Sequence, residues 1–359
     1  MKKVKLGQLV SIQTGKLDAN AAVFGGKYPF FTTAKEISRI NEYAYDGEVV
    51  LVAGNGDLNV KYYKGKFNSY QRTYILTSNS NVRMKYLYYF LDKYIEVLRY
   101  QSIGGVIKYI KLNNLSDAQI PMRSILEQDK IIGILEKLDN EIIIRSKQLS
   151  ELSNLVKSRF NEMFGDFYTT LFPKYKIGEK FEVSSGSTPS RDNKLYWDSG
   201  TINWVKTTEV INREITETEE KITKFALENT SLKLFPVDTI LIAMYGQGQT
   251  RGRSAILKVE STSNQACGAI FPNKIDNPVF IWHQLMLRYS ELRELGRGGN
   301  QPNLNGQLIK NFELIFPPLA LQNEFADFVA QVDKSQLAIQ KSLEELETLK
   351  KSLMQEYFG

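Results

Sequence analysis

The chain has very little cysteine or histidine, with one residue of each among 359. A lone cysteine, Cys267, excludes an internal disulfide, and a lone histidine excludes a histidine-rich metal site or a Cys/His zinc site of ordinary ligand count. Any Ser-His-Asp or Cys-His catalytic group would have to use His283. It stands in the apolar, helix-like segment 280–285 with no nucleophile motif nearby, so we interpret it as a packing or surface residue.

Long apolar runs are also missing. The longest, such as 49–53 and 131–135, are far too short to span a bilayer. The N-terminus begins Met-Lys-Lys-Val-Lys and then turns polar, so it lacks the apolar stretch of a signal peptide. Together with the single cysteine, these features predict a cytoplasmic protein with no membrane partner.

Motifs of the common enzyme classes are absent as well. There is no P-loop, and no carboxylate cluster followed by a lysine of the kind that nucleases use. The Phe-Pro-Pro-Leu run at 316–319 lacks the Asn or Asp that an amino-methyltransferase places before its two prolines, and no glycine-rich loop suited to S-adenosylmethionine accompanies it. We therefore predict a chain with no catalytic residues, metal or cofactor of its own.

The sequence does contain a long internal repeat. Residues 69–165, moved along by 194 positions, align without a gap on residues 263–359. Two copies are too few for a solenoid. The repeat therefore predicts a chain with internal pseudo-twofold symmetry and two similar functional surfaces. The matched positions include Ser69 and Ser263, Gln71 and Gln265, the Gly-Gly pairs 104–105 and 298–299, Gln128 and Gln322, Asp139 and Asp333, and the Phe-Gly pairs 164–165 and 358–359.

Each half ends in a segment with the pattern of a long helix. Apolar residues recur at the three- and four-residue spacing of a helix seam, with Arg145 at one seam position of the first segment. The proline pair 317–318 marks the start of the second segment. The seam residues are Leu138, Ile142, Leu149, Leu152 and Val156 in the first segment, and Val332, Ile339, Leu343, Leu346, Leu349 and Leu353 in the second.

Helices of this length, about 55–60 Å, need a partner to be stable. The repeat supplies one, so we predict that the two segments pair as an antiparallel coiled coil that holds a globular domain at each end. The alternative is that each helix packs back on its own domain. The predicted order is a first globular domain at 1–123, a spacer helix at 124–165, a second globular domain at 166–316 and a second spacer helix at 317–359.

Both globular parts mix short β-rich runs with helical ones, which predicts an α/β or mixed α+β fold. A boundary near residue 165 is supported by Lys-Leu-Gly at 5–7, which recurs as Lys-Ile-Gly at 176–178. Candidate strands are 49–53, 74–76, 239–244 and 255–259, and candidate helices are 84–99 and 279–295.

Charge is unevenly distributed along the chain. The net charge is +6, but residues 1–165 hold 24 Lys and Arg against 16 Asp and Glu, whereas residues 166–359 hold 22 against 24. A basic half suits a polyanion such as nucleic acid. Solvated surface lysine is the plainer interpretation, and net charge alone does not separate the two.

Two stretches carry the side chains that usually contact DNA. In 61–72, basic residues alternate with tyrosines and amides, which can meet phosphates and base edges. A tyrosine-rich hairpin is an equally good interpretation of this stretch, since aromatic residues favour strands. In 245–253, glycines alternate with glutamines and arginines. Glycine lets the backbone approach a ligand closely, although this spacing is not a dinucleotide fingerprint.

The second half also carries a recognisable set of motifs, namely Ser-Gly-Ser-Thr-Pro-Ser-Arg at 185–191, Tyr-Trp at 196–197, Gly-Thr-Ile at 200–202 and Trp-Val-Lys at 204–206. They resemble the opening of a target-recognition domain in the specificity subunits of type I restriction–modification systems. The first half resembles a divergent version, with Thr-Gly-Lys at 14–16 and Tyr-Pro-Phe-Phe at 28–31 but without the other parts. Each domain ends in Ile-Pro or Phe-Pro-Pro, then a glutamine and an amphipathic helix, as in that family.

The resemblance implies a non-catalytic scaffold that reads double-stranded DNA. In such families each recognition domain reads one half of a bipartite, asymmetric target, and the paired helices space the halves and dock two methyltransferase subunits. Motor-nuclease restriction subunits join them, and S-adenosylmethionine, ATP and magnesium belong to those partners. By residue type and motif position we expect DNA contacts from Lys16, Lys61, Tyr63, Arg72 and Lys108 in the first domain and from Thr188, Arg191, Gln247, Gln249, Arg251 and Arg253 in the second.

Three alternatives remain open on the sequence alone. A bipartite DNA-binding regulator that works by itself would bind duplex DNA without a methyltransferase. An enzyme would need the motifs that are missing. A coiled-coil interaction protein with no nucleic-acid partner would leave the basic first domain and the recognition-domain motifs unexplained.

Overall fold

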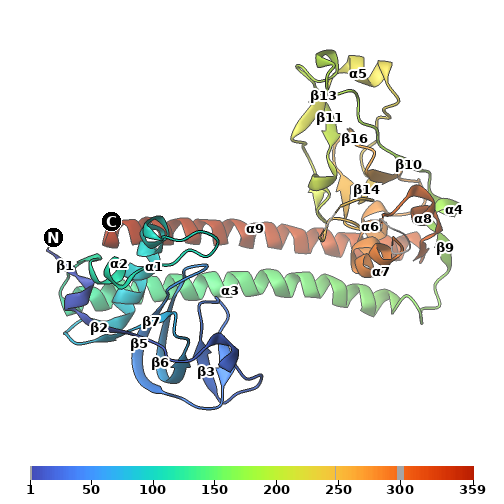
Figure 1. Ribbon diagram of the computed structural model, residues 1–359. Helices are drawn as coiled ribbons and strands as arrows, with labels where there is room; N and C mark the ends of the chain where they lie inside the picture. Colours follow the sequence, from blue (N-terminus) through green and yellow to red (C-terminus); the bar gives the residue numbers. More distant parts are fainter. Residues whose placement is uncertain (1, 247, 297–302) are drawn as a thin grey trace. The chain divides into compact units, whose positions relative to one another are not determined.

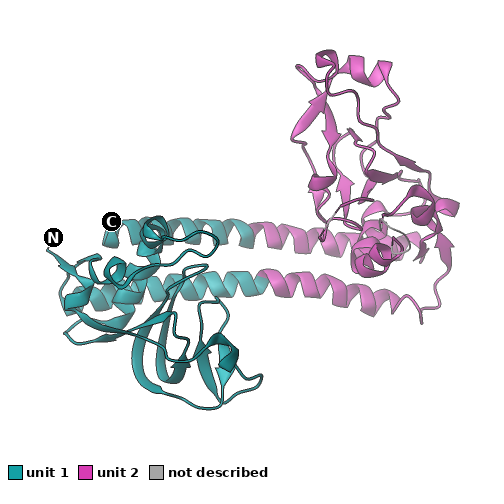
Figure 2. Ribbon diagram, viewed as in Figure 1, with its two compact units in different colours: residues 1–148, 339–359 teal, residues 149–338 magenta. Residues whose placement is uncertain are grey.

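The computed structural model describes residues 2–246, 248–296 and 303–359. The chain divides into two compact units: unit 1 comprises 1–148 and 339–359, and unit 2 comprises 149–338 (Figure 2). Two 40-residue helices, α3 (Ile125–Phe164) and α9 (Leu319–Phe358), each contribute to both units (Figure 1). Within the described ranges, no helix combines the length and apolarity needed to cross a membrane.

Unit 1 is built on a six-stranded sheet with the strand order β2-β7-β5-β6-β3-β4. Neighbouring strands are antiparallel except β3 and β6, which run parallel. The β-rich run 49–53 is the buried end of β5, because hydrophobic side chains there face the core on both sides of the sheet. The strands are β2 (Val10–Thr14), β3 (Tyr28–Phe31), β4 (Ser38–Ile40), β5 (Tyr45–Ala53), β6 (Val60–Ser69) and β7 (Thr73–Ser78).

The other elements of unit 1 are helices and a separate pair of short strands. A separate pair of strands, β1 (Lys3–Lys5) and β8 (Gln119–Pro121), joins the start of the chain to the end of the globular part. Helix α1 (Met84–Gln101) contributes eight buried residues to the core. The remaining short elements are η1 (Leu6–Gln8), η2 (Ala19–Ala21) and α2 (Leu112–Ser116).

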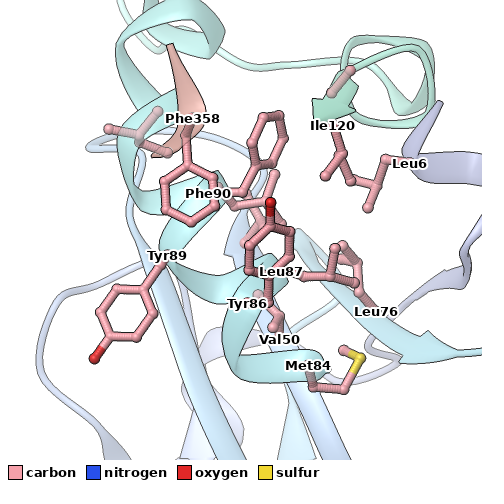
Figure 3. Packing of buried hydrophobic residues seen from close by; sticks show 14 of the residues in the cluster. Leu6, Val50, Leu76, Met84, Tyr86, Leu87, Tyr89, Phe90, Ile120 and Phe358 are labelled. Carbon is pink, nitrogen blue, oxygen red and sulfur yellow. The ribbon is translucent and has the colours of Figure 1, made fainter. Parts of the chain in front are cut away.

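The core of unit 1 includes the ends of both long helices. The ring of Phe358, in the last turn of α9, lies 5.0 Å from the ring of Tyr86 and 6.2 Å from that of Phe90 on α1. Figure 3 shows these three rings gathered beside Leu87. Ile131 and Leu135 of α3 belong to the same cluster, so the helix ends are integral parts of a globular core.

Unit 2 follows the same plan with shorter strands. Its sheets have the orders β10-β17-β14-β15-β12, β13-β11-β16 and β18-β9. Its strands are β9 (Lys174–Lys176), β10 (Val183–Ser185), β11 (Ile202–Val205), β12 (Glu214–Ile215), β13 (Glu220–Ile222), β14 (Ile240–Ala243), β15 (Ser254–Leu257), β16 (Ser261–Ser263), β17 (Cys267–Ile270) and β18 (Glu313–Ile315). Its helices besides α3 and α9 are α4 (Ile177–Lys180), η3 (Lys194–Tyr196), η4 (Thr207–Glu209), α5 (Lys224–Asn229), α6 (Pro278–Leu287), α7 (Tyr289–Glu294) and α8 (Gly306–Asn311).

The core of unit 2 likewise takes in both long helices. Phe160 and Phe164 of α3 pack against Phe325 of α9, with ring centroids 5.4 and 5.8 Å apart, and against Phe280 of α6. The same apolar cluster continues into the five-stranded sheet through Ile240 and its neighbours. Each unit therefore contains one globular part and one stretch of paired helix.

The long helices are antiparallel, as the sequence predicts, because the contacts move back along α3 as they move forward along α9, as the pairs Glu324–Arg159 and Gln336–Ser153 show in unit 2. In unit 1, Lys350 of α9 pairs with Asp139 of α3 at 2.6 Å. In unit 2, Arg159 of α3 pairs with Glu324 of α9 at 2.8 Å. The mixed α/β fold with a repeated plan and two paired long helices is thus confirmed, while the division into four sequence domains stays a prediction.

Most predicted seam residues face the partner helix or the adjoining core. Leu349 does not: it is 47% exposed, and this assignment is wrong. An α-helix has 3.6 residues per turn, so a stripe drawn at 3.5 drifts around it. Near this end of α9 the inward positions include Leu346, Leu353 and Met354, together with Lys350 through its ion pair, whereas Leu349 lies on the exposed side. Leu138, Val156 and Val332 are buried, and partly buried seam residues are Ile142, Arg145, Leu149, Leu152, Ile339, Leu343, Leu346 and Leu353.

The predicted strands coincide with β5, β7, β14 and β15, and the helix predicted at 84–99 is α1. The helix predicted at 279–295 is two helices, α6 and α7, because the backbone changes direction at Arg288 (φ −104°, ψ 26°). The Arg288 guanidinium lies over the rings of Phe167 and Phe312, 3.5 and 4.4 Å from their centroids. This packing fixes the break.

Candidate nucleic-acid interface

In unit 1, four loops are bonded together into what we call the first loop cluster: residues 14–17, 54–57, 69–73 and 103–111. The N–H of Gly15 donates to the carbonyl of Thr73 at 3.2 Å, and that of Gly54 donates to the carbonyl of Arg72 at 2.8 Å. The N–H of Gly56 donates to the carbonyl of Lys108 at 2.9 Å. These bonds make one surface from segments that are far apart in the sequence.

Glycine is required at one point of this cluster. A Cβ on Gly15 would overlap the carbonyl oxygens of Ser69 and Tyr70. Only a residue without a side chain lets the end of β2 lie directly on the 69–73 loop. The Thr-Gly-Lys motif therefore has a structural reason: its glycine allows the contact, and Lys16 follows at the surface.

Three of the predicted DNA-contacting residues lie on the first loop cluster. Lys16, Arg72 and Lys108 are all exposed there. They come from three of its four loops, so the fold concentrates positive charge that the sequence spreads over some 90 residues. Side chains of this type can hold phosphates and, for arginine, read guanine.

Lys61 and Tyr63 are held differently. The Lys61 ammonium donates to the carbonyl of Ala34 at 2.7 Å, and burial lowers its pKa. The Tyr63 ring packs on Phe31 and Phe67, with centroids 5.1 and 5.8 Å apart. Both residues belong to strand β6, where side-chain contacts within the unit occupy them. The hairpin interpretation therefore describes this part of 61–72. A role of Lys61 and Tyr63 in DNA contact stays a prediction, and their contacts within the unit count against it.

Unit 2 repeats the arrangement in what we call the second loop cluster: residues 185–188, 245–253 apart from 247, and 263–267. The N–H of Gly186 donates to the carbonyl of Cys267 at 3.2 Å. A Cβ on Gly186 would overlap the carbonyl oxygen of Ser263. Cys267 and Ser263 are the repeat partners of Thr73 and Ser69, so each unit uses the same glycine-on-carbonyl contact.

The 245–253 loop is held by helix α7. Tyr289 donates from its hydroxyl to the carbonyl of Gln249 at 2.7 Å, and Arg293 donates to the carbonyl of Arg251 at 3.1 Å and to that of Gly248. Sequence reasoning missed both side chains, because they stand about 40 residues away in a segment whose pattern indicates only helix. They fix the backbone of a loop rich in glutamine and arginine.

Most of the predicted DNA-contacting residues of unit 2 have partners inside the unit. Thr188 is exposed and donates to the side chain of Gln265. Gln249 is exposed and accepts a hydrogen bond from Arg253, which is half-buried, at 2.8 Å. Such bonds can hold a side chain in the orientation that a ligand needs, as well as satisfying part of its hydrogen-bonding capacity.

Arg191 carries a structural contact. Its guanidinium lies 3.9 Å from the Trp197 ring centroid and 4.7 Å from that of Trp204, and it forms an ion pair with Glu220. The hydrogen bond and charge of Arg191 lower the pKa of the Glu220 carboxyl. The arginine and both tryptophans of the recognised motif thus pack on one another, which explains why these residue types occur together.

Arg251 and Gln247 differ from the expectation in other ways. Arg251 is only 6% exposed, so its side chain lies within the unit; its role in base contact stays a prediction, and this burial counts against it. The backbone carbonyl of Arg251 accepts the hydrogen bond from Arg293 of α7, which holds this part of the loop against the helix. Gln247 and the Gly-Gly pair at 298–299 lie outside the described residues.

The lone histidine and cysteine are packing residues. Burial lowers the pKa of His283 to about 4, and its ring lies 5.5 Å from that of Phe325. Burial raises the pKa of the Cys267 thiol to about 12, which leaves it unreactive. In the part of the chain that the structure describes, His, Cys, Asp and Glu side chains form no group of three or more that could hold a metal ion.

Comparison with known proteins was made by sequence and by structure. A family model for the type I restriction modification DNA specificity domain matches residues 1–154 and again residues 171–349. The specificity subunit of the Escherichia coli type I restriction enzyme EcoDI is 38% identical over 161 residues, which are 45% of this chain and 36% of that protein. The EcoR124I/EcoR124II specificity subunit of Escherichia coli is 25% identical over 267 residues, 70% of this chain and 63% of that protein.

These matches span about a third of the length of the first relative and somewhat under two thirds of the second. Among solved structures, the S subunit of a type I restriction–modification system from M. genitalium superposes with a TM-score of 0.69 at 18% identity. That superposition covers 100% of this chain and 96% of the other. It shows that the two chains share a fold.

Proposed function

Because this chain belongs to the type I restriction modification DNA specificity family, we propose that it is the specificity subunit of a type I restriction–modification enzyme. In this proposal each unit reads one half of a bipartite, asymmetric target in double-stranded DNA. The observation that carries it is the pair of loop clusters. Gly15 packs on the 69–73 loop and Gly186 packs on the 263–267 loop in the same way. The residues that the two clusters expose differ in type.

The difference between the clusters supports two different half-sites. The first loop cluster presents exposed cations, Lys16, Arg72 and Lys108, from three loops. The second presents Gln249 and Arg253 on a loop fixed by α7. Gln pairs best with adenine and Arg with guanine, so surfaces composed differently would select different bases.

The long helices are proposed as the docking platform for two methyltransferase subunits. Within unit 1, Ile143 and Ile144 of α3 are 63% and 45% exposed. Within unit 2, Leu337 of α9 is 73% exposed. Neighbouring exposed apolar residues such as Ile143 and Ile144 would gain free energy if a partner covered them. Motor-nuclease restriction subunits would join this complex, and S-adenosylmethionine, ATP and magnesium would be bound by the partners.

This chain itself would take no catalytic step. Its proposed contribution is selection of the DNA sequence, and the complex would act in the cytoplasm, where the DNA is. A regulator that reads a bipartite site without partners is the alternative from the sequence, and no observation on the structure favours it.

The decisive experiment is co-expression with the methyltransferase subunit, followed by mapping of methylated adenines across the genome by single-molecule sequencing. We expect a bipartite motif that requires both proteins. A stable complex without a new motif would argue that a recognition domain is inactive. Specific DNA binding by the isolated chain, with no complex and no motif, would favour the regulator.

A further inference from the structure

The connection between α1 and α2 in unit 1 carries an apolar tip, residues 104–107. Val106 is fully exposed and Ile107 is 63% exposed, although aliphatic side chains gain free energy on leaving water. Backbone hydrogen bonds run in both directions between Ile103 and Tyr109, at 2.9 and 2.8 Å, and close the segment into a hairpin. Two aliphatic side chains are thus presented together on an ordered turn.

The base of this hairpin is fixed to the first loop cluster. The N–H of Ile110 donates to the carbonyl of Gly54 at 2.9 Å, and the hydroxyl of Tyr74 donates to the carbonyl of Ile110 at 3.2 Å. Gly56 bonds the carbonyl of Lys108, as described above. The loop therefore stands on the surface that carries the exposed cations and does not fold back on the core.

The turn itself is encoded by glycine. Gly104 has φ +116°, a conformation that residues with side chains rarely adopt, and a Cβ there would lie 2.6 Å from the carbonyl oxygen of Ile107. Gly105 next to it leaves the top of the turn open. The sequence thus specifies a conformation that keeps Val106 and Ile107 in water. Exposure of these side chains costs free energy, and contact with a partner would remove that cost.

Charge indicates which partner fits the tip. Lys108 and Lys111, both exposed, flank it, and Lys16 and Arg72 lie on the same loop cluster. An apolar surface ringed by cations is complementary to DNA, which is anionic at the phosphates and apolar at one feature of the major groove, the 5-methyl group of thymine. We take DNA as the partner because the loop cluster that carries the tip also carries the exposed cations Lys16, Arg72 and Lys108.

We propose that Val106 and Ile107 contact thymine methyl groups in the half-site that unit 1 reads, while the surrounding cations hold phosphates. This inference rests on the proposed function and adds the chemistry of one contact to it. It requires at least one A·T pair in that half-site. It also requires that the contact be insensitive to salt, because an apolar contact releases no counterions.

The test uses the full chain in complex with its methyltransferase subunit and a duplex of the mapped target sequence. Thymines of the half-site are replaced one at a time by deoxyuridine, which removes only the methyl group. Fluorescence anisotropy gives the Kd of each duplex. For the wild type we expect one or two replacements to weaken binding roughly three- to fivefold.

The variant V106S/I107S should bind the unmodified target roughly tenfold more weakly and should not respond to deoxyuridine at those positions. Both side chains are exposed, so folding should be unchanged, and thermal unfolding checks this. Leu171→Ser is the matched control, because Leu171 is also fully exposed but lies outside both loop clusters; it should leave every Kd unchanged. Lys108→Ala should weaken binding to all duplexes alike and lower the salt slope by about one.

The possible failures are distinguishable. A wild-type complex without sequence-specific binding would overturn the proposed function and this inference with it. Specific binding that is equal in the wild type and V106S/I107S, or a deoxyuridine effect that is equal in both, would overturn the inference alone. So would a V106S/I107S chain that no longer assembles with the methyltransferase subunit on gel filtration, since the tip would then be a protein contact.

Discussion

The side-chain oxygen of Gln128 accepts a hydrogen bond from the backbone N–H of Arg83, 3.0 Å away, at the residue that precedes α1. The amide nitrogen of Gln128 donates to the carbonyl of Arg123 at 2.9 Å, and the side chain is fully buried. One glutamine thus ties the first turn of α3 to the start of α1. This bond fixes how the long helix leaves the globular part of unit 1.

Unit 2 contains the same device. Gln322, the repeat partner of Gln128, accepts from the N–H of Asn277 at 2.8 Å and donates to the carbonyl of Pro317 at 2.8 Å. Asn277 is the N-cap of α6. The repeat therefore conserves a buried polar contact, which explains why a glutamine recurs in an otherwise apolar setting.

We expect Gln128→Leu to lower the free energy of unfolding by about 1–3 kcal/mol, because the shape is kept while buried backbone groups lose their partner. Gln331→Leu on the exposed side of α9 is the matched control and should change it by less than about 0.5 kcal/mol. Urea unfolding followed by circular dichroism measures both. Equal midpoints for the two variants would show that the bond does not stabilise the unit.

We expect Gly15→Ala to impair recognition of one half-site and Gly186→Ala the other. In each case the added methyl group would overlap a loop carbonyl, so the loop must move. Genome-wide mapping of methylated adenines should show a relaxed or missing half of the motif, on different sides for the two variants. Loss of the whole motif in both would contradict the assignment of one half-site to each unit.

Gly133→Ala is the control for these glycine substitutions. Gly133 lies inside α3, and a Cβ there meets no atom within 4 Å beyond the backbone of its own helix turns. The change should raise the free energy of unfolding by about 0.5–1 kcal/mol, since glycine is a poor helix former, and should leave the motif intact.

The long helices could be predicted from the sequence because their apolar pattern is sustained over many turns and occurs twice. The pattern did not identify every residue that faces the partner helix. The seam pattern includes Leu349, but this residue is exposed. Its neighbour Lys350 is the one that faces α3, through its ion pair with Asp139. A single sequence does not show such a contact, because its partner lies on another helix.

The candidate site could be predicted only in part, for a similar reason. Lys16, Arg72 and Lys108 are exposed as expected, since loop lysines and arginines usually are. Arg191 is exposed but lies against Trp197 and Trp204, and Arg251 is buried within unit 2. The ion pair of Arg191 with Glu220 and the burial of Arg251 depend on how the chain folds, so residue type and motif position could not distinguish these two arginines from free surface arginines.

The stability of unit 2 should depend on the protonation of His283. Burial lowers its pKa in the folded state to about 4, against about 6.5 when unfolded. The unfolded state therefore binds more protons between these values, and stability falls as the pH drops through that window. We expect a loss of about 1–3 kcal/mol between pH 7 and pH 4 from this group.

The sign and the source can both be checked, because the chain has no other histidine. His283→Phe keeps an aromatic ring beside Phe325 and removes the titrating group. Its unfolding free energy should decline less than that of the wild type between pH 7 and pH 5, measured by urea unfolding at each pH. Parallel pH profiles for the two proteins would show that His283 is protonated equally well in both states.

Finally, we expect the bonds from α7 to the 245–253 loop to control the second half-site. Tyr289→Phe removes the hydrogen bond to the carbonyl of Gln249 while keeping the ring, so the loop should become more mobile. Loss of one such bond is worth about 0.5–1.5 kcal/mol, which predicts a three- to tenfold smaller preference for the correct second half-site. Arg293→Lys should do more, because lysine lacks the planar fork that reaches two carbonyls.

Tyr175→Phe is the matched control, since Tyr175 of β9 packs through its ring on Phe316. Methylation rates of the complex on duplexes with substitutions in one half-site at a time give the readout. A general loss of folding would lower the rates on all duplexes together. If Tyr289 positions the loop, Tyr289→Phe should lower the preference for the correct second half-site and leave the preference for the first unchanged. An equal effect on both half-sites would assign Tyr289 to stability alone, and the loop would then owe its conformation to its own glycines.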